Sequence, residues 1–274
     1  VGGKPYADEG IMAAAYICGV NHLYAVGGSQ AIGAMAYGTE SVPKVDVIVG
    51  PGNKFVASAK KAVFGAVGID MVAGPTEVLI IADKNANPAW VAADLLAQAE
   101  HDIVAQPILV TDSVEFAEKV SNQIESQLET LTTKAIARQS IDNYGKIILV
   151  DDLKEAVEVA NRKAPEHLEL ALDDNDTRKK LEKEVHNFGS LFIGHYSAEV
   201  FGDYAAGLNH TLPTSGTAKY TGGLSVRVFL KTVTTLRTKE DAAGVVRSAV
   251  AAGFLGDAEG LAGHARAARI RIEK

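Results

Sequence analysis

Short apolar runs rich in Val, Ile and Leu alternate with helical patterns along most of the chain. The runs expected to form strands are 22–27, 45–50, 77–83, 106–112, 146–152 and 189–194. Helical patterns occupy 7–18, 29–38, 53–64, 87–101, 113–130, 153–163, 176–186 and 197–206. Nearly continuous apolar strands separated by helices are typical of parallel sheets that are covered on both faces. The sequence therefore predicts an α/β protein.

The alternation of apolar strands and helices ends after about residue 213. A Gly/Ser/Thr-rich linker at 212–225 precedes one β-like run, 232–238, and then two helical stretches, 239–254 and 257–271. A second boundary is expected near the glycine-containing turn "AGPTE" that precedes the 77–83 run. These signals predict two α/β domains and a helical tail, with boundaries at 1–76, 77–213 and 214–274.

Composition and charge argue against some classes of protein, such as nucleic-acid-binding and membrane proteins. The 274 residues are 47% hydrophobic, enough for one large or two modest cores, and the net charge is −7 with both signs interspersed. A nucleic-acid partner usually needs a basic face, which this chain lacks. No stretch approaches the roughly 18 uninterrupted apolar residues of a membrane span, so no membrane association is expected. The chain begins at Val1 and enters a helical pattern almost at once, so we expect it to be part of a longer protein.

A single cysteine, Cys18, excludes an internal disulfide and is consistent with a reducing cytoplasm. Its apolar neighbours predict a buried small hydrophobe rather than a nucleophile.

The segment "LLAQAEHDI" places polar side chains in the last turn of an otherwise apolar helix. Gln98 and His101 are three residues apart and would share a helix face. A solvated helix end is the simpler interpretation, because a histidine also suits the negative end of the helix dipole. The alternative interpretation is that Gln98 and His101 bind one ligand together.

Two glycine-containing turns link predicted strands to helices. "AVGGSQAIGAMA" resembles a phosphate-binding turn but departs from G-x-G-x-x-G, and it lacks the acidic residue expected about 20 positions on. In "VGPGNK", Asn53 is expected at a helix N-cap, where a cap is commoner than a ligand contact, although helix N-termini also receive phosphates.

Three further segments carry titratable side chains. "KAPEHLEL" places Glu166 and His167 at a helix-to-strand junction, as a base and its carboxylate neighbour or as a structural ion pair. "FGDYAAGLNHTLPT" carries Asp203, and His210 in an irregular stretch. "AEGLAGHARAARIRI" carries Glu259 and His264, which would diverge by about 140° on one straight helix, so a solvated face is the simpler interpretation there.

Zinc binds nitrogen and oxygen ligands, and catalytic zinc sites keep a position open for substrate. His101, Asp203 and His264, with the amide oxygen of Gln98, would form such a set. Their spacing alone does not establish convergence, because the chain has no compact metal motif such as H-E-x-x-H.

Several ordered segments together resemble the histidinol dehydrogenase family and cover nearly the whole chain. They are "VGGSQAIGAMAYGTE", "VDVIVGPGNKFVASAKKAVFG", "VGIDMVAGPTEVLIIAD", "ADLLAQAEHD", "APEHLEL", "GDYAAGLNHTLPTSGTA" and "EGLAGHA". The resemblance implies two incomplete Rossmann-like parallel-sheet domains, similar to those of aldehyde dehydrogenases, and a C-terminal helical tail. Residues 1–76 would then be the nucleotide-binding domain, and 77–213 would carry most of the metal and catalytic residues.

The activity implied by the resemblance is the zinc-dependent, NAD-linked oxidation of L-histidinol to L-histidine through L-histidinal, with two hydride transfers. Members of this family are cytoplasmic homodimers in which the C-terminal tail reaches the partner's site. Position by position, the resemblance assigns zinc to Gln98, His101, Asp203 and His264, and the acid/base pair to Glu166 and His167. It assigns nucleotide contacts to Gln30 and Asn53, and substrate contacts to Thr76 and Glu259 as well as to His167 and the zinc ligands.

Two departures leave the substrate open. Position 76 is Thr where many relatives have Ser, and "YTGGLSVRVFLKT" differs from the usual family pattern. The alternatives are a related zinc/NAD dehydrogenase of another small alcohol such as a sulfonated diol, a non-catalytic metal-binding relative, and a metallohydrolase. In each, Gln98, His101 and Asp203 are expected to converge in a cleft between 1–76 and 77–213, at the carboxyl ends of parallel strands.

Overall fold

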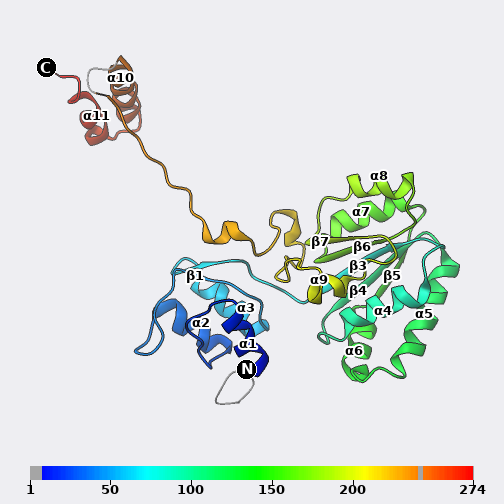
Figure 1. The fold of residues 1–274 in the computed structure, drawn as a ribbon. Helices are drawn as coiled ribbons and strands as arrows, with labels where there is room; N and C mark the ends of the chain where they lie inside the picture. Colours follow the sequence, from blue (N-terminus) through cyan, green and yellow to red (C-terminus); the bar gives the residue numbers. More distant parts are fainter. Residues whose placement is uncertain (1–7, 240–242, 274) are drawn as a thin grey trace. The chain divides into compact units, whose positions relative to one another are not determined.

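The computed structural model describes residues 8–239 and 243–273 (Figure 1). The chain divides into two compact units, residues 1–230 and 231–274, which are described separately.

A five-stranded parallel sheet is the centre of the first unit. Its strands are β3 (Glu77–Ala82), β4 (Gln106–Thr111), β5 (Lys146–Leu149), β6 (His167–Ala171) and β7 (Ser190–Ile193), in the order β5-β4-β3-β6-β7. Every residue of the central strand β3 is buried. The chain therefore reverses its direction of travel across the sheet between β5 and β6, which brings β6 beside β3.

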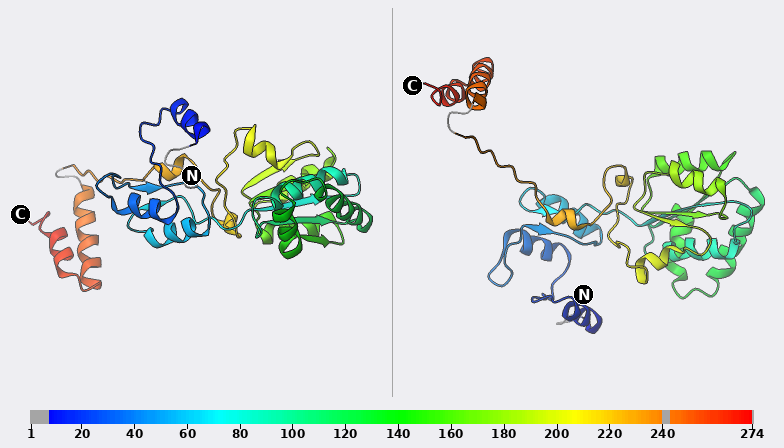
Figure 2. Two further views of the ribbon diagram at one scale, coloured as in Figure 1. Left: turned by 90° about the horizontal axis from the view of Figure 1, so that it is seen from below. Right: turned by 45° about the horizontal axis from the view of Figure 1, so that its top comes forward.

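Helices cover both faces of this sheet (Figures 1 and 2). One face carries α4 (Pro88–Ala99), α5 (Val114–Leu128) and α6 (Lys134–Tyr144), and the other carries α7 (Leu153–Lys163) and α8 (Asp176–Glu184). Val78 and Ile80 of β3 belong to the first apolar core, whereas Leu79 and Ile81 belong to the second. Because successive strand residues point to opposite faces, one continuous apolar strand serves both cores. The predicted α/β class with parallel strands is confirmed.

A smaller α/β part precedes β3. It contains α1 (Glu9–Ile17), α2 (Gly28–Tyr37), β1 (Val47–Ile48), α3 (Lys54–Val63) and β2 (Gly68–Ile69), and β1 pairs in parallel with β2. Ile32 and Ala36 of α2 pack with Ile48, Val63 and Val67. The strand expected at 45–50 is thus reduced to two paired residues, and 22–27 forms no strand.

The prediction that Cys18 is buried is wrong. Cys18 is exposed at the C-terminal end of α1, and no residue of α1 is buried. The apolar neighbours that suggested a core position are exposed, except Ala15, which is half-buried.

Several elements differ from the sequence expectations. Helix α6 was not expected, and 232–238 forms no strand. Toward the C-terminal end of the first unit lie the short helix α9 (Glu199–Tyr204) and two 3₁₀ turns, η1 (Thr217–Lys219) and η2 (Val226–Phe229). Among the residues described, no helix combines the length and the apolar character needed to cross a bilayer.

The second unit contains the helices α10 (Ala243–Ala258) and α11 (Ala262–Arg269). They pack closely where a Cβ on Gly256 would lie 2.8 Å from the backbone nitrogen of Ala265. Glu259 falls between the two helices and His264 lies in α11, so the single straight helix assumed for this pair is wrong. Two of the predicted helices, 7–18 and 239–254, include residues that the structure does not describe. These are residue 7 of the first and residues 240–242 of the second.

Candidate active site

The candidate site lies at the amino ends of β3 and β6. Thr76 immediately precedes β3, Glu166 immediately precedes β6, and His167 is the first residue of β6, paired with Val78. The expected location at the carboxyl ends of the strands is therefore wrong. The difference arises because the polar residues stand before these apolar strands rather than after them.

A tight connection between α7 and β6 places Glu166 and His167 at this edge. Ala164 caps α7 in the left-handed conformation (φ 53°), and Pro165 follows it. Gly189, just before β7, lies so close that an added Cβ would be 2.5 Å from the carbonyl oxygen of Glu166. Only glycine fits there, and its N–H donates to the carbonyl of Pro165 at 3.0 Å.

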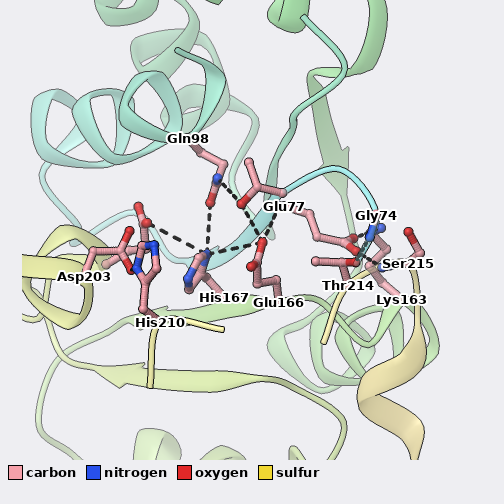
Figure 3. Close-up of polar contacts among 12 residues, drawn as sticks. Gly74, Glu77, Gln98, Lys163, Glu166, His167, Asp203, His210, Thr214 and Ser215 are labelled. Carbon is pink, nitrogen blue, oxygen red and sulfur yellow. Dashed lines mark hydrogen bonds and ion pairs between the residues drawn. The ribbon is translucent and has the colours of Figure 1, made fainter. Parts of the chain in front are cut away.

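A chain of hydrogen bonds connects His167 to Glu166 (Figure 3). Nδ1 of His167 lies 3.1 Å from Oε1 of Gln98, and Nε2 of Gln98 donates to Oγ1 of Thr76 at 2.7 Å. The hydroxyl of Thr76 donates to Oε2 of Glu166 at 2.5 Å, and the backbone N–H of Glu77 donates to the same oxygen at 3.1 Å.

This chain sets the tautomer of His167. Ionised Glu166 can only accept, so the hydroxyl of Thr76 must donate to it and accept from the amide nitrogen of Gln98. The carbonyl oxygen of Gln98 then faces His167, whose Nδ1 must be the donor. The lone pair of the neutral imidazole is therefore on Nε2, where it can act as a base.

Burial shifts the pKa values of both residues. Burial raises the pKa of Glu166 to about 7, against the lowering effect of the hydrogen bond from Thr76. Burial lowers the pKa of His167 to about 4. His167 is thus neutral near pH 7, while Glu166 is divided between its acid and carboxylate forms. A pKa near 7 suits the acid/base role of Glu166, whereas the low pKa of His167 keeps its imidazole neutral but makes it a weaker base.

Three side chains close to this pair could hold a metal ion. Ligand atoms of His101, Glu199 and Asp203 all lie within 4.8 Å of one another. Glu199 and Asp203 are four residues apart on α9 and share a face. His101 follows the end of α4, so it does not share a helix face with Gln98, which is fully buried within α4.

The donor set fits a divalent metal such as zinc. It offers imidazole nitrogen and carboxylate oxygen, which zinc binds in tetrahedral or open sites. Both carboxylate oxygens of Glu199 are buried and lack a hydrogen-bond partner among the described residues. A buried polar atom without a partner is costly, and a cation nearby would offset that cost.

Asp203 has an outer partner in His210. Nδ1 of His210 lies 2.9 Å from Oδ1 of Asp203, and the side chain of Asp203 is 7% exposed. A partner of this kind fixes the orientation of a metal-binding carboxylate.

Three acidic side chains form a layer behind the site; two of them are buried, and Asp94 is half-buried. It consists of Asp94 on α4, Glu169 on β6 and Glu199 on α9. Burial raises the pKa of Asp94 to about 6 and that of Glu199 to about 8. Burial, together with the charges of Asp94 and Glu199, also raises the pKa of Glu169. The layer therefore carries less negative charge at neutral pH than its three carboxyl groups would suggest.

A pocket opens over these residues, with a volume of about 160 Å³. Its lining includes Pro51, Gly52, Met71, Ala73, Gly74, Thr76, His101, Glu166, His167, Asp203, His210, Thr211, Leu212 and Thr214. The lining comes from both sides of residue 76, as expected for the cleft, so segments distant in sequence share one cavity.

A tether holds residues 214–215 against the start of β3. The N–H of Gly74 donates to Oγ1 of Thr214 at 2.6 Å, and the N–H of Ser215 donates to Oε1 of Glu77. Lys163 forms an ion pair with Oε2 of Glu77 and donates to Oε1 of Gln106 at 2.9 Å. These contacts fix the backbone on either side of Thr76.

The structure brings together Thr76, Gln98, His101, Glu166, His167 and Asp203 of the residues predicted for the site. Of the predicted nucleotide contacts, Gln30 is exposed on α2, and Asn53 caps α3 by accepting from the N–H groups of Phe55 and Val56. Glu259 and His264 are exposed in the second unit, so their predicted contacts stay predictions.

Glu199 and the other two side chains of the acidic layer were not predicted as site residues from the sequence. The signal was present in "EVFGD", where Glu199 stands four residues before Asp203 on a predicted helix. Two carboxylates at that spacing share a face.

Comparison with known proteins identifies the family. The family model described as histidinol dehydrogenase matches residues 3–272. The chain belongs to the histidinol dehydrogenase family. It is 50% identical to the histidinol dehydrogenase of Streptococcus mutans over 264 residues, which are 96% of this chain and 61% of that protein. It is also 50% identical to the histidinol dehydrogenase of Aquifex aeolicus over 268 residues, covering 98% of this chain and 62% of that protein.

A solved histidinol dehydrogenase shares the fold. The crystal structure of histidinol dehydrogenase from Elizabethkingia anophelis matches with a TM-score of 0.86 and 40% sequence identity, covering 96% of this chain and 59% of that one. The chain thus spans about three fifths of the length of the histidinol dehydrogenases that it matches.

Proposed function

We propose that this chain forms the catalytic part of a zinc- and NAD-dependent histidinol dehydrogenase, which oxidises L-histidinol through L-histidinal to L-histidine. The observation that carries the proposal is the hydrogen-bonded chain from His167 to Glu166, beside the donor group that contains His101 and Asp203. The names of the relatives supply the substrate.

The first oxidation needs a base for the alcohol proton. Nε2 of His167 carries the free lone pair and accepts that proton while the carbon loses a hydride. NAD would accept the hydride. The lowered pKa of His167, about 4, keeps the imidazole neutral near pH 7, so it is ready to accept.

The second oxidation needs water to add to the aldehyde. The carboxylate of Glu166 takes a proton from that water, and the hydrated aldehyde then loses a second hydride. In total, one water and two NAD molecules are consumed, and one carboxylate, two NADH and three protons are formed. Thr76 keeps one lone pair free, because its hydroxyl donates to Glu166 and accepts from Gln98.

Zinc would be held by Gln98, His101 and Asp203, with His264 completing the set. When bound, it would lower the pKa of the substrate hydroxyl as a Lewis acid. Gln98 would contribute its carbonyl oxygen, and His210 holds the carboxylate of Asp203 in place.

The proposal includes a cytoplasmic homodimer in which the tail reaches the partner's site. Gln30 and Asn53 would contact the nucleotide, and Glu259 would pair with the ammonium group of the substrate.

The deciding experiment uses the full-length protein. We expect NADH to form with L-histidinol, to cease after treatment with a chelator, and to return when zinc is added. A faster reaction with sulfonated or simple diols than with histidinol would favour a related alcohol dehydrogenase. Zinc binding without NADH formation would favour a non-catalytic relative.

A further inference from the structure

The starting point is the single hydrogen bond that orients the imidazole of His167. Its Nδ1 lies 3.1 Å from Oε1 of Gln98. The proposed function assigns that same oxygen to the metal. An amide oxygen that binds a cation is a weaker acceptor, because its electron density is drawn toward the ion. His167 then needs a second acceptor to keep its proton on Nδ1.

Two carboxylates lie close enough to Nδ1 of His167 to be this second hydrogen-bond acceptor. Oε2 of Glu166 is 4.0 Å from Nδ1 of His167, but it already accepts from Thr76 and from the N–H of Glu77. Oε1 of Glu199 is 3.8 Å from the same nitrogen. Both oxygens of Glu199 lack a hydrogen-bond partner within the described residues, and Glu199 is 1% exposed. Glu199 is therefore the acceptor with free capacity.

The packing of α9 fixes Glu199 in this place. The ring of Phe192 on β7 lies against His167, with centroids 6.0 Å apart. A Cβ on Gly202 of α9 would lie 2.9 Å from atoms of that same ring. Helix α9 thus rests on Phe192, which in turn rests on His167. Small movements of the imidazole and of α9 are coupled through one aromatic ring.

We propose that Glu199 is a positioning residue for His167, accepting its Nδ1–H when the oxygen of Gln98 is bound to the metal and so keeping the lone pair on Nε2. This inference rests on the proposed function, because it assumes that Gln98 is a metal ligand. It gives Glu199 a role different from that of His101 and Asp203, although the three lie together.

The test is the tautomer of His167, measured by NMR in full-length protein labelled with ¹⁵N-histidine. The His167 signals are assigned by their loss in His167→Gln. Zinc-loaded wild type should show a protonated Nδ1 and an unprotonated Nε2. Glu199→Met, which removes the acceptor at similar length, should populate the other tautomer when zinc is bound. Without zinc, the bond to Gln98 should preserve the wild-type tautomer.

Two further variants sharpen the test. Glu199→Gln retains an acceptor oxygen and should restore most of the wild-type tautomer. Glu199→Leu also lacks an acceptor, so it replaces Glu199→Met, with the same expected change, if that variant does not fold. Glu169→Met makes the same change in the same buried layer, and it should leave the tautomer unchanged. In steady-state assays, Glu199→Met should lower kcat on the order of 10²-fold, the scale of one proton-transfer group, with little change in KM.

Several results would overturn the proposal. They are a zinc-loaded Glu199→Met with the wild-type tautomer, a wild type protonated on Nε2, and an equal change in Glu169→Met. Loss of stoichiometric zinc in Glu199→Met would show that Glu199 is a metal ligand instead. A wild type that binds no zinc would overturn the proposed function and this inference together. A wild type that binds zinc and reduces NAD, with an unchanged Glu199→Met tautomer, would overturn this inference alone.

Discussion

His167 and Glu166 are neighbours in the chain, and their side chains are connected through Gln98 and Thr76 rather than by a direct hydrogen bond. Two adjacent residues are thus linked by a path that passes through α4 and the residue before β3. The state of one group can therefore affect the orientation of the other.

Two substitutions of Thr76 should distinguish the effect of its hydroxyl group from the effect of its side-chain volume. Thr76→Val removes the link between Gln98 and Glu166 at constant shape, whereas Thr76→Ser keeps it. We expect Thr76→Val to lower kcat at least tenfold and to lose about 1–3 kcal/mol of unfolding free energy, because buried hydrogen-bonding groups lose a partner. Steady-state kinetics and thermal unfolding measure the two effects. Equal activity of the Val and Ser variants would contradict the relay.

His167→Ala and Glu166→Gln should have different kinetic effects. Loss of the imidazole should impair both oxidations by about 10²- to 10⁴-fold, whereas loss of the carboxylate should mainly slow the oxidation of L-histidinal. Separate assays with histidinol and histidinal distinguish the steps, and zinc analysis should show unchanged metal content in both. Oxidation of histidinal at the wild-type rate by Glu166→Gln would refute the role given to Glu166.

The stability of the metal-free protein should depend on the ionisation of Glu166. Burial raises its folded-state pKa to about 7, from an ordinary value of 4.5. The folded state then binds the proton more tightly than the unfolded state, so stability falls as pH rises between these two values. The loss is on the order of 3 kcal/mol, from about 1.4 kcal/mol for each pH unit.

Denaturant unfolding of wild type and Glu166→Gln across pH 4 to 8 would measure this loss as the difference between the two curves, since other groups titrate in both. A constant difference over the whole range would show that the pKa of Glu166 is not raised.

Glu199→Met should stabilise the metal-free protein. The carboxylate oxygens of Glu199 are buried without a hydrogen-bond partner in the part of the chain described, and an unsatisfied buried polar group costs about 1–3 kcal/mol. We expect an increase of that size in unfolding free energy, together with the loss of kcat described above. Wild-type stability in this variant would indicate that water already satisfies the carboxylate.

Exchange of the C-terminal tail between subunits can be tested by mixing. If His264 completes the partner's zinc site, His264→Ala and His101→Ala proteins should each be inactive alone. Heterodimers formed after mixing should regain part of the activity, because one of their two sites has every ligand. Failure of mixed dimers to recover activity, with dimer formation verified, would contradict the exchange.

Local patterns predicted most of the large sheet. The runs at 77–83 and 106–112 became β3 and β4 because each is a continuous apolar run that can be buried on both faces. Helix α6 was missed because its pattern is polar, with only Ala137 and Ser140 buried. The apolar run at 22–27 forms no strand, which shows that an apolar run alone does not provide a pairing partner.

The candidate site was predicted only in part. Residues such as Gln98 and Asp203 were found from their chemistry and the family resemblance, whereas the importance of Glu199 depends on the contact between α9 and His167. The prediction that the site lies at the carboxyl ends of the strands was wrong for a related reason. The general preference for carboxyl ends does not apply when, as with Thr76 and Glu166, the polar residues precede their strands.

The position of the site at the amino ends of β3 and β6 leaves the opposite edge of the sheet free for engineering. The exposed residues Lys84 and Asn85 lie in the turn that follows β3 at its carboxyl end, and neither lines the pocket. Surface turns of this kind are where inserted sequences are best tolerated. A fluorescent reporter or an immobilisation peptide placed there would be separated from the reacting groups by the length of the central strand.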